Sequence, residues 1–140
     1  MCGAVEWRQT YDEATVGSRF LSRYGWFDVA SPRGLVVTRA CAVGVLFLGP
    51  ETLYPAHAHP AVERYDVLAG AARWWLEGGD WQTREVGGAV RVPSGTPHAM
   101  RTDAEPLLAL YAWLGDLDTP ARLTGADGIG GVSVDPPDAR

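Results

Sequence analysis

The stretch His57-Ala-His-Pro-Ala-Val-Glu-Arg-Tyr65 decides the fold of this chain and most of what can be inferred about its function. It places two histidines and a glutamate in the pattern His-x-His-x-x-x-Glu, and Gly70 follows after six intervening residues. Alternate side chains of a strand point to the same face, so an extended backbone would put His57, His59, Glu63 and Tyr65 on one face. Imidazoles and a carboxylate are typical ligands of divalent transition metals.

The third and last histidine of the chain lies in a second motif, Gly87-x5-Pro93-x-Gly95-x-x-His98. Sixteen residues separate the glycine that ends the first motif from the glycine that begins the second. His98 is therefore expected to reach the same ligand group from another strand. Three histidines and one carboxylate can hold a divalent ion and still leave coordination positions open for a substrate.

The remaining pattern predicts one helix followed by strands. Apolar residues recur at helical spacing over 12–24, and Gly25 is expected to end that helix. Short apolar or alternating segments then follow one another between turn residues, which is typical of an all-β sandwich or barrel. Strands are expected within 35–48, with a break near 41–44, and at 55–68, 72–76, 81–86, 89–92, 98–102 and 107–114. Pro60 is expected to force an edge position or a bulge within 55–68.

Composition limits the classes of protein that remain. With 140 residues, 46% of them hydrophobic, the chain is long enough for one globular domain. A net charge of -5 argues against nucleic acid as a partner, and the absence of lysine excludes a lysine Schiff base. The N-terminus lacks the pattern of a signal peptide, and the longest apolar stretch, 40–48, is too short to span a bilayer. A cytoplasmic protein without a membrane partner is the expectation.

Beyond the two motifs, a connected series of segments carries a resemblance to a known family. The motifs themselves resemble the paired motifs of the cupin superfamily, including their glycines and proline. The series runs through Trp7-Arg-Gln-Thr-Tyr11, Phe20-Leu-x-x-Tyr-Gly-Trp26, Leu53-Tyr-Pro-x-His57, Pro93-Ser-Gly-x-Pro-His-Ala-Met-Arg-Thr102 and Leu107-Leu-Ala-Leu-Tyr-x-Trp113. Together these segments look like the cupin-type dimethylsulfoniopropionate (DMSP) lyases in their single-domain form.

The resemblance implies a fold and a reaction. The fold would be all-β, a single cupin barrel (a double-stranded β-helix or jelly roll) with an N-terminal helix. Residues 1–30 would supply the helix and a lead-in strand, 31–116 the barrel, and 117–140 an extended or mobile tail. The reaction would be a metal-dependent β-elimination that converts DMSP to dimethyl sulfide and acrylate.

The resemblance also implies roles for individual residues. His57, His59, Glu63 and His98 would bind one divalent ion, for which this ligand set permits Fe, Mn, Ni, Co or Zn. Tyr65 would be the catalytic base and Tyr54 a second active-site tyrosine. A tyrosine is a feasible base only if its pKa falls well below about 10, and a nearby cation favours the phenolate. The same cation would polarise the substrate carboxylate.

Aromatic side chains are expected around the sulfonium end of the substrate, because cations are attracted to ring faces. The candidate substrate-binding residues on the expected strands are Trp74, Trp81, Met100, Tyr111 and Trp113. Two other readings stay open: another metal-cupin enzyme, a dioxygenase or isomerase acting on a small carboxylate, and a non-catalytic cupin that binds a small molecule through its metal. A homodimer is expected, formed through the outer sheet and the N-terminal helix, because open sheet edges and many apolar residues need cover.

Overall fold

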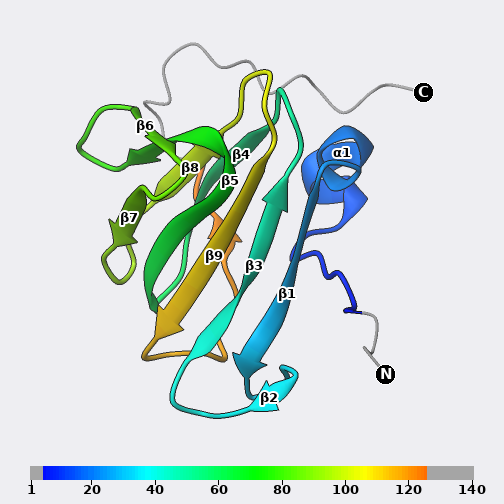
Figure 1. The fold of residues 1–140 in the computed structure, drawn as a ribbon, viewed down its shortest axis with the longest axis vertical. Coiled ribbons are helices and arrows are strands. Elements are labelled where there is room, and N and C mark those ends of the chain that lie inside the picture. Colours follow the sequence, from blue (N-terminus) through cyan, green and yellow to red (C-terminus); the bar gives the residue numbers. More distant parts are fainter. Residues whose placement is uncertain (1–4, 126–140) are drawn as a thin grey trace.

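The computed structural model describes residues 5–125, which form one curled sheet with a helix against its edge (Figure 1). The elements in chain order are α1 (Glu13–Leu21), β1 (Tyr24–Ser31), β2 (Val36–Val37), β3 (Ala42–Leu48), β4 (Leu53–Ala58), β5 (Val62–Leu76), β6 (Gln82–Glu85), β7 (Ala89–Val92), β8 (His98–Arg101), β9 (Leu107–Leu114) and β10 (Arg122–Leu123). The expected all-β architecture with an N-terminal helix is confirmed. Within the described residues, no helix is long and apolar enough to cross a membrane.

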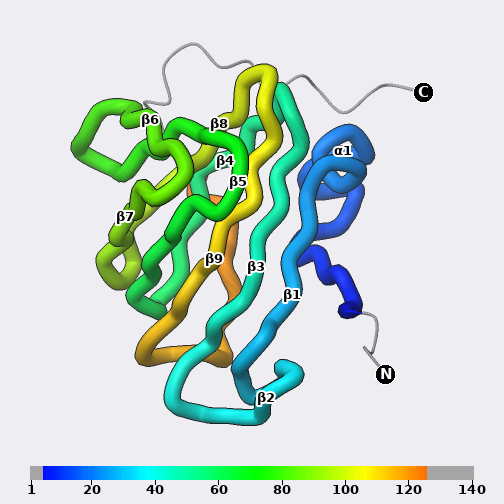
Figure 2. The backbone as a smooth tube through the Cα atoms, in the orientation of Figure 1, coloured from blue at the N-terminus to red at the C-terminus, as the bar shows by residue number. Residues whose placement is uncertain are grey.

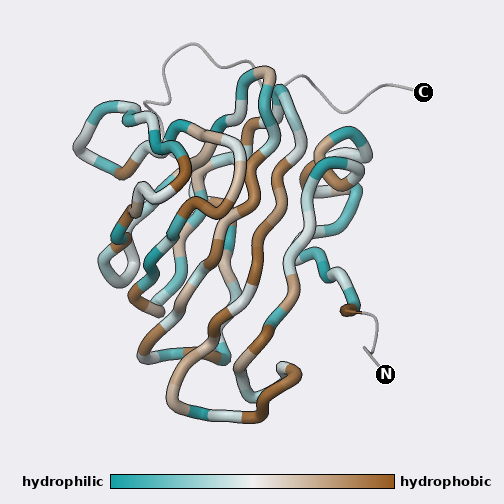
Figure 3. The backbone as a smooth tube through the Cα atoms, viewed as in Figure 1, coloured by the Kyte–Doolittle hydropathy of each residue, from teal (hydrophilic) through white to brown (hydrophobic). Residues whose placement is uncertain are grey.

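The strands follow the order β10-β4-β8-β5-β9-β3-β1-β2, and β6 and β7 both pair with β5. All pairings are antiparallel except that of β1 with β2. The tube in Figure 2 shows β1, β3, β9 and β5 side by side, with β4 and β8 behind them. The longest hydrophobic stretches run along β3 and β9, the central strands of this layer (Figure 3). The sheet thus curls around an interior to which all the long strands contribute.

Half-way along the long strand β5, the face that points to the interior changes from odd-numbered to even-numbered residues. Its register against β9 shifts between Val67 and Ala69, which marks a bulge. Before the shift the odd-numbered Glu63, Tyr65 and Val67 are buried, and after it the even-numbered Ala72 and Trp74 are buried. Gly70 follows the bulge with a φ of +72°, and the Pro106 carbonyl oxygen occupies the place of a Cβ atom there. The glycine of the first motif is therefore required by the backbone.

The N-terminal helix is shorter than the apolar spacing predicts. Asp12 caps it by accepting a hydrogen bond from the Thr15 backbone N–H at 2.9 Å, and the helix ends at Leu21 rather than at Tyr24. Gly17, with φ 80° and ψ 156°, interrupts it. The prediction of 12–24 was wrong at its C-terminal end, because Tyr24 pairs with Leu48 as the first residue of β1.

The first motif occupies two strands rather than one. β4 ends at Ala58 and β5 begins at Val62, so Pro60 lies in a turn between them rather than at a bulge. The turn is held to the second motif, since the Gly95 N–H donates to the His59 carbonyl at 2.9 Å. β4 and β5 are not neighbours in the sheet, because β8 lies between them. The expectation of a single strand was wrong, but the motif side chains still face one interior.

The segment predicted as a tail from residue 117 is partly built into the fold. Arg122 and Leu123 form β10, which pairs with Ala58 and His57 at the edge of β4. The Thr124 N–H donates to the Ala56 carbonyl at 2.9 Å. Residues 126–140 of the predicted tail lie outside the described residues. The part that is described therefore borders the strand that carries His57.

Candidate metal centre and active site

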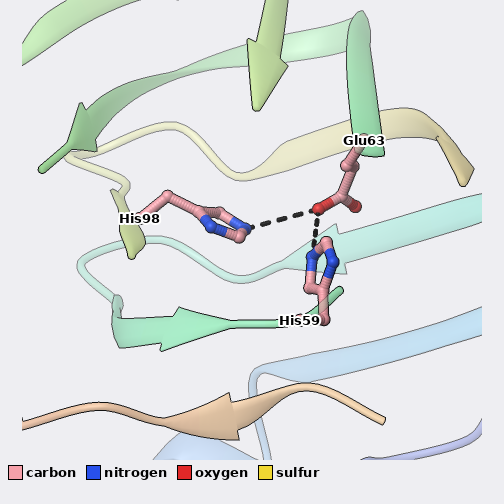
Figure 4. A group of neighbouring side chains, drawn as sticks. All are labelled: His59, Glu63 and His98. Atoms are coloured by element: carbon pink, nitrogen blue, oxygen red, sulfur yellow. Dashed lines mark hydrogen bonds and ion pairs between the residues drawn. The ribbon is translucent and has the colours of Figure 1, made fainter. Parts of the chain in front are cut away.

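Three donor atoms from two motifs converge in the interior. One ligand atom each from His59, Glu63 and His98 lies within 4.8 Å of the others, and all three side chains are buried. Figure 4 shows the Glu63 carboxylate facing both imidazoles. Its Oε2 atom is 2.7 Å from His59 Nε2 and 3.3 Å from His98 Nε2. The group therefore joins the turn after β4, the start of β5 and the start of β8.

Each histidine ring is held by a backbone carbonyl two residues away. Nδ1 lies 2.8 Å from the Pro55 oxygen in His57, 3.0 Å from the Ala61 oxygen in His59 and 2.9 Å from the Thr96 oxygen in His98. A carbonyl only accepts hydrogen bonds, so Nδ1 carries the proton and the neutral ring keeps its lone pair on Nε2. Such hydrogen bonds orient metal-binding histidines in general.

The donor set fits a divalent ion. If both rings are neutral, the Nε2 atoms of His59 and His98 present lone pairs to an ionised carboxylate, which is repulsive unless a cation lies among them. His98 Nε2 is also fully buried without a hydrogen-bond partner in the described structure. Donors bound at about 2.0–2.2 Å to one ion lie about 3 Å apart when they are neighbours around it, a value that the two observed separations bracket. The residues are thus suited to a metal, and their mixed N and O chemistry does not select one metal.

His57 lies beside this trio but outside the group of converging atoms. Its ring centroid is 4.1 Å from that of His98 and 6.4 Å from that of His59. Burial and the neighbouring His98 lower the pKa of His57 well below its usual value, so the ring is neutral. It keeps a lone pair on Nε2, as a fourth ligand requires.

Glu63 supplies the negative charge of the donor group. Burial alone would raise the pKa of this carboxyl, but its interactions with His59 and His98 outweigh burial and lower the pKa to about 2. The carboxylate therefore stays ionised at neutral pH. A buried anion of this kind needs a positive partner, which is the role of a metal ion or of protonated imidazoles.

A cavity of about 280 Å³ opens onto the donor group. His57, His59 and Glu63 line it, together with both predicted catalytic tyrosines, Tyr65 and Tyr54. Tyr65 is 3% exposed and lies two residues beyond Glu63 on β5. The rings of Tyr54 and His57 are tilted by 34° with centroids 3.8 Å apart, and the Tyr54 hydroxyl is 3.0 Å from that of Tyr11. The structure thus brings three of the four predicted ligands and both tyrosines to one cavity, and His98 reaches the donor group from outside its lining.

Both tyrosines are neutral in the metal-free protein. Burial, the charge of Glu63 and a hydrogen bond to that carboxylate raise the pKa of Tyr65 well above its usual value. Burial and the neighbouring tyrosines Tyr24 and Tyr11 do the same for Tyr54. Of the two, Tyr65 is the one hydrogen-bonded to Glu63, so a cation bound by Glu63 acts most strongly on it.

The predicted substrate-binding residues divide into three groups. Tyr111 and Trp113 line the cavity, and the Trp113 ring stacks on His59 with centroids 4.1 Å apart. Met100 and Trp74 are fully buried beneath the cavity, where Met100 pairs with both Tyr54 and Trp74 across the sheet, and neither belongs to the lining. Trp81 lies elsewhere, packed against a separate cluster of Ala56, Trp75 and Ala99.

Several residues that line the cavity were not predicted as site residues from the sequence. They include Arg8 and Thr10 before the helix, Tyr24, Trp26 and Asp28 on β1, and Leu117, Asp118, Pro120 and Ala121 after β9. The even-numbered alternation of Tyr24, Trp26 and Asp28 was the available signal, since it is the pattern of one strand face. Without knowledge that β1 borders the interior, that alternation could not be assigned to the site.

The model of the DMSP lyase (dimethylsulfoniopropionate lyase) family matches residues 2–109. The chain belongs to the DMSP lyase family. A curated relative, the DMSP lyase DddQ of Ruegeria pomeroyi, is 38% identical over 127 residues, which cover 90% of this chain and 63% of the relative. The chain thus spans less than two thirds of that protein's length.

Solved structures agree with the family assignment and with the fold. The crystal structure of DMSP lyase DddQ from Ruegeria pomeroyi matches with a TM-score of 0.83 and 36% identity, over 89% of this chain and 63% of that chain. A cupin-like protein from Thermotoga maritima matches with a TM-score of 0.63 and 17% identity, over 74% of this chain and 77% of that chain. The second likeness concerns the fold alone, and it confirms the predicted cupin architecture of this member of the DMSP lyase family.

Proposed function

We propose that the protein is a metal-dependent carbon–sulfur lyase that cleaves DMSP to dimethyl sulfide and acrylate. The observation that carries this proposal is the position of Tyr65. In a chain of the DMSP lyase family, its hydroxyl group shares a cavity wall with the group of metal-type donors and is coupled to Glu63. A base beside a cation site is what an elimination next to a carboxylate requires.

The reaction is a β-elimination without oxidation or reduction. A base removes a proton from the carbon next to the carboxylate, and the electrons of that C–H bond form the C=C bond of acrylate. The bond between the β-carbon and sulfur breaks, and its electron pair leaves with sulfur as neutral dimethyl sulfide. The base then releases its proton to water, so that one proton is produced per turnover.

The residues of this chain divide that work. Tyr65, as phenolate, accepts the α-proton, while Trp113 and Tyr54 pack against His59 and His57 and keep water from the reacting carbon. A divalent ion held by His57, His59, Glu63 and His98 would supply the positive charge that polarises the substrate carboxylate and favours the phenolate. Tyr54 orients the substrate, because its hydroxyl faces Tyr11 rather than the donor group.

The test is headspace detection of dimethyl sulfide from the purified chain with DMSP and, in turn, Fe, Mn, Ni, Co and Zn. Release of dimethyl sulfide with an equal amount of acrylate supports the proposal. An absence of dimethyl sulfide with every metal overturns it. Oxygen consumption in the same vessel would identify a dioxygenase, whereas ligand binding without turnover would identify a metal-dependent binding protein.

We further propose that the protein acts as a homodimer in the cytoplasm. The support for the dimer is the exposed apolar surface near β2, where Leu35, Val36 and Val37 are 60–77% exposed. In addition, the outer edge of β2 pairs with no strand within residues 5–125. Light scattering at micromolar concentration tests the dimer, and a monomer mass would contradict it. Fractionation of producing cells tests the location.

A further inference from the structure

A carboxylate without a cationic partner lies in the cavity, on a strand that carries no metal ligand. Asp28 is half-buried on β1 and lines the cavity that the donor group also lines. Among the described residues, no ion pair joins it to an arginine or a histidine. A partly desolvated anion that has no cationic partner among the described residues is suited to a cationic ligand group.

The orientation of this carboxylate is fixed by two hydroxyl groups. The Tyr111 hydroxyl donates to Asp28 Oδ1 at 2.5 Å, and the Ser31 hydroxyl donates to Asp28 Oδ2 at 2.8 Å. Both oxygens are therefore occupied by neutral donors, which leave the negative charge in place.

The sheet register explains how Tyr111 reaches Asp28. Tyr65 on β5, Tyr111 on β9, Gly44 on β3 and Asp28 on β1 form one row of paired residues across four strands. Gly44 has no side chain, and a Cβ atom there would collide with the Tyr111 hydroxyl and the Phe27 carbonyl. The absence of a side chain at Gly44 thus leaves the space that the Tyr111 side chain crosses. The row runs from Tyr65, the proposed base, to the Asp28 carboxylate.

Aromatic faces border the same carboxylate. The rings of Trp26 and Tyr111 lie 6.5 Å apart at an interplanar angle of 80°, and both line the cavity. Onium groups are bound in proteins by aromatic faces, and an adjacent anion strengthens that binding. The part of the cavity around Asp28 has both features. The donor group beside Tyr65, at the other end of the row, suits a carboxylate.

We propose that Asp28, Trp26 and Tyr111 form a subsite for the onium group of a zwitterionic substrate, with Asp28 as the residue that selects for positive charge. The inference rests on the proposed function in one respect, the assignment of the substrate carboxylate to the donor group. It adds a specificity-determining residue, Asp28, and a positioning residue, Tyr111. Neither is a metal ligand or the base.

Two arginines in the same cavity carry positive charge, which acts against the binding of a cationic group. Arg8 and Arg33 also line the cavity, and the Arg8 guanidinium lies 6.0 Å from the centre of the Trp26 ring. If their charge cancels that of Asp28 within the cavity, the chain will not distinguish a cation from a neutral group. We expect the Asp28 carboxylate, which two hydroxyl groups hold in a fixed orientation, to outweigh these two arginines.

The experiment compares two ligands of the same shape that differ in charge. 3-(Trimethylammonio)propionate carries an onium group, and 4,4-dimethylpentanoate replaces its nitrogen with carbon. Their affinities for the metal-loaded chain are measured by calorimetry for the wild type, Asp28→Asn, Tyr111→Phe and Asp118→Asn. Asp118 also lines the cavity but is exposed at its mouth, so its substitution is a control for the same loss of charge.

The wild type is expected to prefer the onium ligand by about tenfold or more, as one partly screened charge pair permits. Asp28→Asn should remove most of this preference while the affinity for the neutral ligand stays within about twofold. Tyr111→Phe should reduce the preference only in part, because the charge remains, and Asp118→Asn should leave it unchanged. Equal preferences in the wild type and Asp28→Asn overturn the subsite.

The outcomes separate this inference from the proposed lyase activity. Binding is measured without turnover, so an Asp28-dependent preference in a chain that releases no dimethyl sulfide would retain the subsite and reject the lyase. Release of dimethyl sulfide, together with a charge preference that Asp28→Asn does not change, would retain the lyase and reject the subsite. Circular dichroism of Asp28→Asn checks the fold, and the neutral ligand's affinity checks the cavity in the same sample.

Discussion

Tyr65 and Tyr111 lie directly opposite each other on β5 and β9, and both side chains line the cavity. Their surroundings differ, however. Tyr65 is coupled to the Glu63 carboxylate of the donor group, and Tyr111 donates its hydrogen bond to Asp28. Two tyrosines at paired positions therefore allow a hydroxyl group beside the candidate metal ligands to be compared with one beside Asp28.

Removal of the Tyr65 hydroxyl should abolish most of the turnover. Tyr65→Phe preserves ring volume and metal binding but removes the base, so kcat for dimethyl sulfide release should fall by about 10²- to 10⁴-fold. Tyr111→Phe is the matched comparison, and it should act mainly on KM, with kcat within about tenfold of the wild type. Steady-state kinetics with headspace detection measures both. If Tyr65→Phe turns over normally and Tyr54→Phe does not, the roles of Tyr65 and Tyr54 must be exchanged.

Loss of any donor side chain should release the metal. His57→Ala, His59→Ala and His98→Ala should each weaken metal binding by more than about 100-fold, because second-sphere changes alone cost about 10- to 100-fold. Asp103→Asn, which removes a surface carboxylate paired with Arg73, is the control and should keep full occupancy. Elemental analysis after dialysis gives the metal content. A full complement of metal in His59→Ala and His98→Ala would refute the assignment.

The metal-stripped chain should lose stability steeply in alkali. All five tyrosines are buried enough that their pKa values lie above the usual 10 in the folded chain. The folded state thus holds its phenolic protons more tightly than the unfolded state. The free energy of unfolding is at its full value below pH 10 and falls above it, by up to about 1.4 kcal/mol per pH unit for each tyrosine.

Urea denaturation at a series of pH values measures this dependence, and phenolate absorbance reports ionisation directly. Absorbance should rise only together with unfolding. Tyr24→Phe should reduce the slope of stability against pH by about one proton. Phenolate absorbance at pH 10 in a chain that is still fully folded would show that burial does not control these groups.

A side chain at Gly44 should disturb both the sheet and the Asp28–Tyr111 hydrogen bond. Gly44→Ala places a methyl group against the Phe27 carbonyl and the Tyr111 hydroxyl, and overpacking of this kind costs about 1–3 kcal/mol. Gly79→Ala is the control, since its nearest neighbour, the Leu76 oxygen, would be 3.5 Å from the new Cβ. Chemical denaturation should show a change in stability for the first variant alone. Equal stabilities would mean that β1 and β9 adjust at little cost.

The grouping of the candidate metal ligands could be predicted because three of them lie close together in the sequence. Side-chain alternation indicated that His57, His59, Glu63 and Tyr65 share a face, and they line one cavity even though the chain turns at Pro60. The turn keeps the arrangement because the interior lies between β4 and β5, so each strand presents its own ligands to it. His98 could be added because the second motif has its own glycines and proline.

The opposite wall could not be predicted, because its residues meet only through the sheet. Asp28 and Tyr111 are 83 positions apart, and nothing local links them. The aromatic residues show a second limit of the sequence pattern. The bulge in β5 reverses the faces after Val67, so alternation counted from Glu63 gives the wrong side for Trp74, which packs beneath the cavity near Tyr65.

The cavity draws its lining from Arg8 near one end of the described chain and from Ala121 near the other. Contacts between such distant positions form slowly in folding, because long loops must close before the contacts are made. The binding site is therefore completed only when β10 has joined β4 and the segment before α1 has joined β1. A ligand that fills the cavity has no affinity for a half-folded chain, so its binding energy is added to the stability of the whole domain.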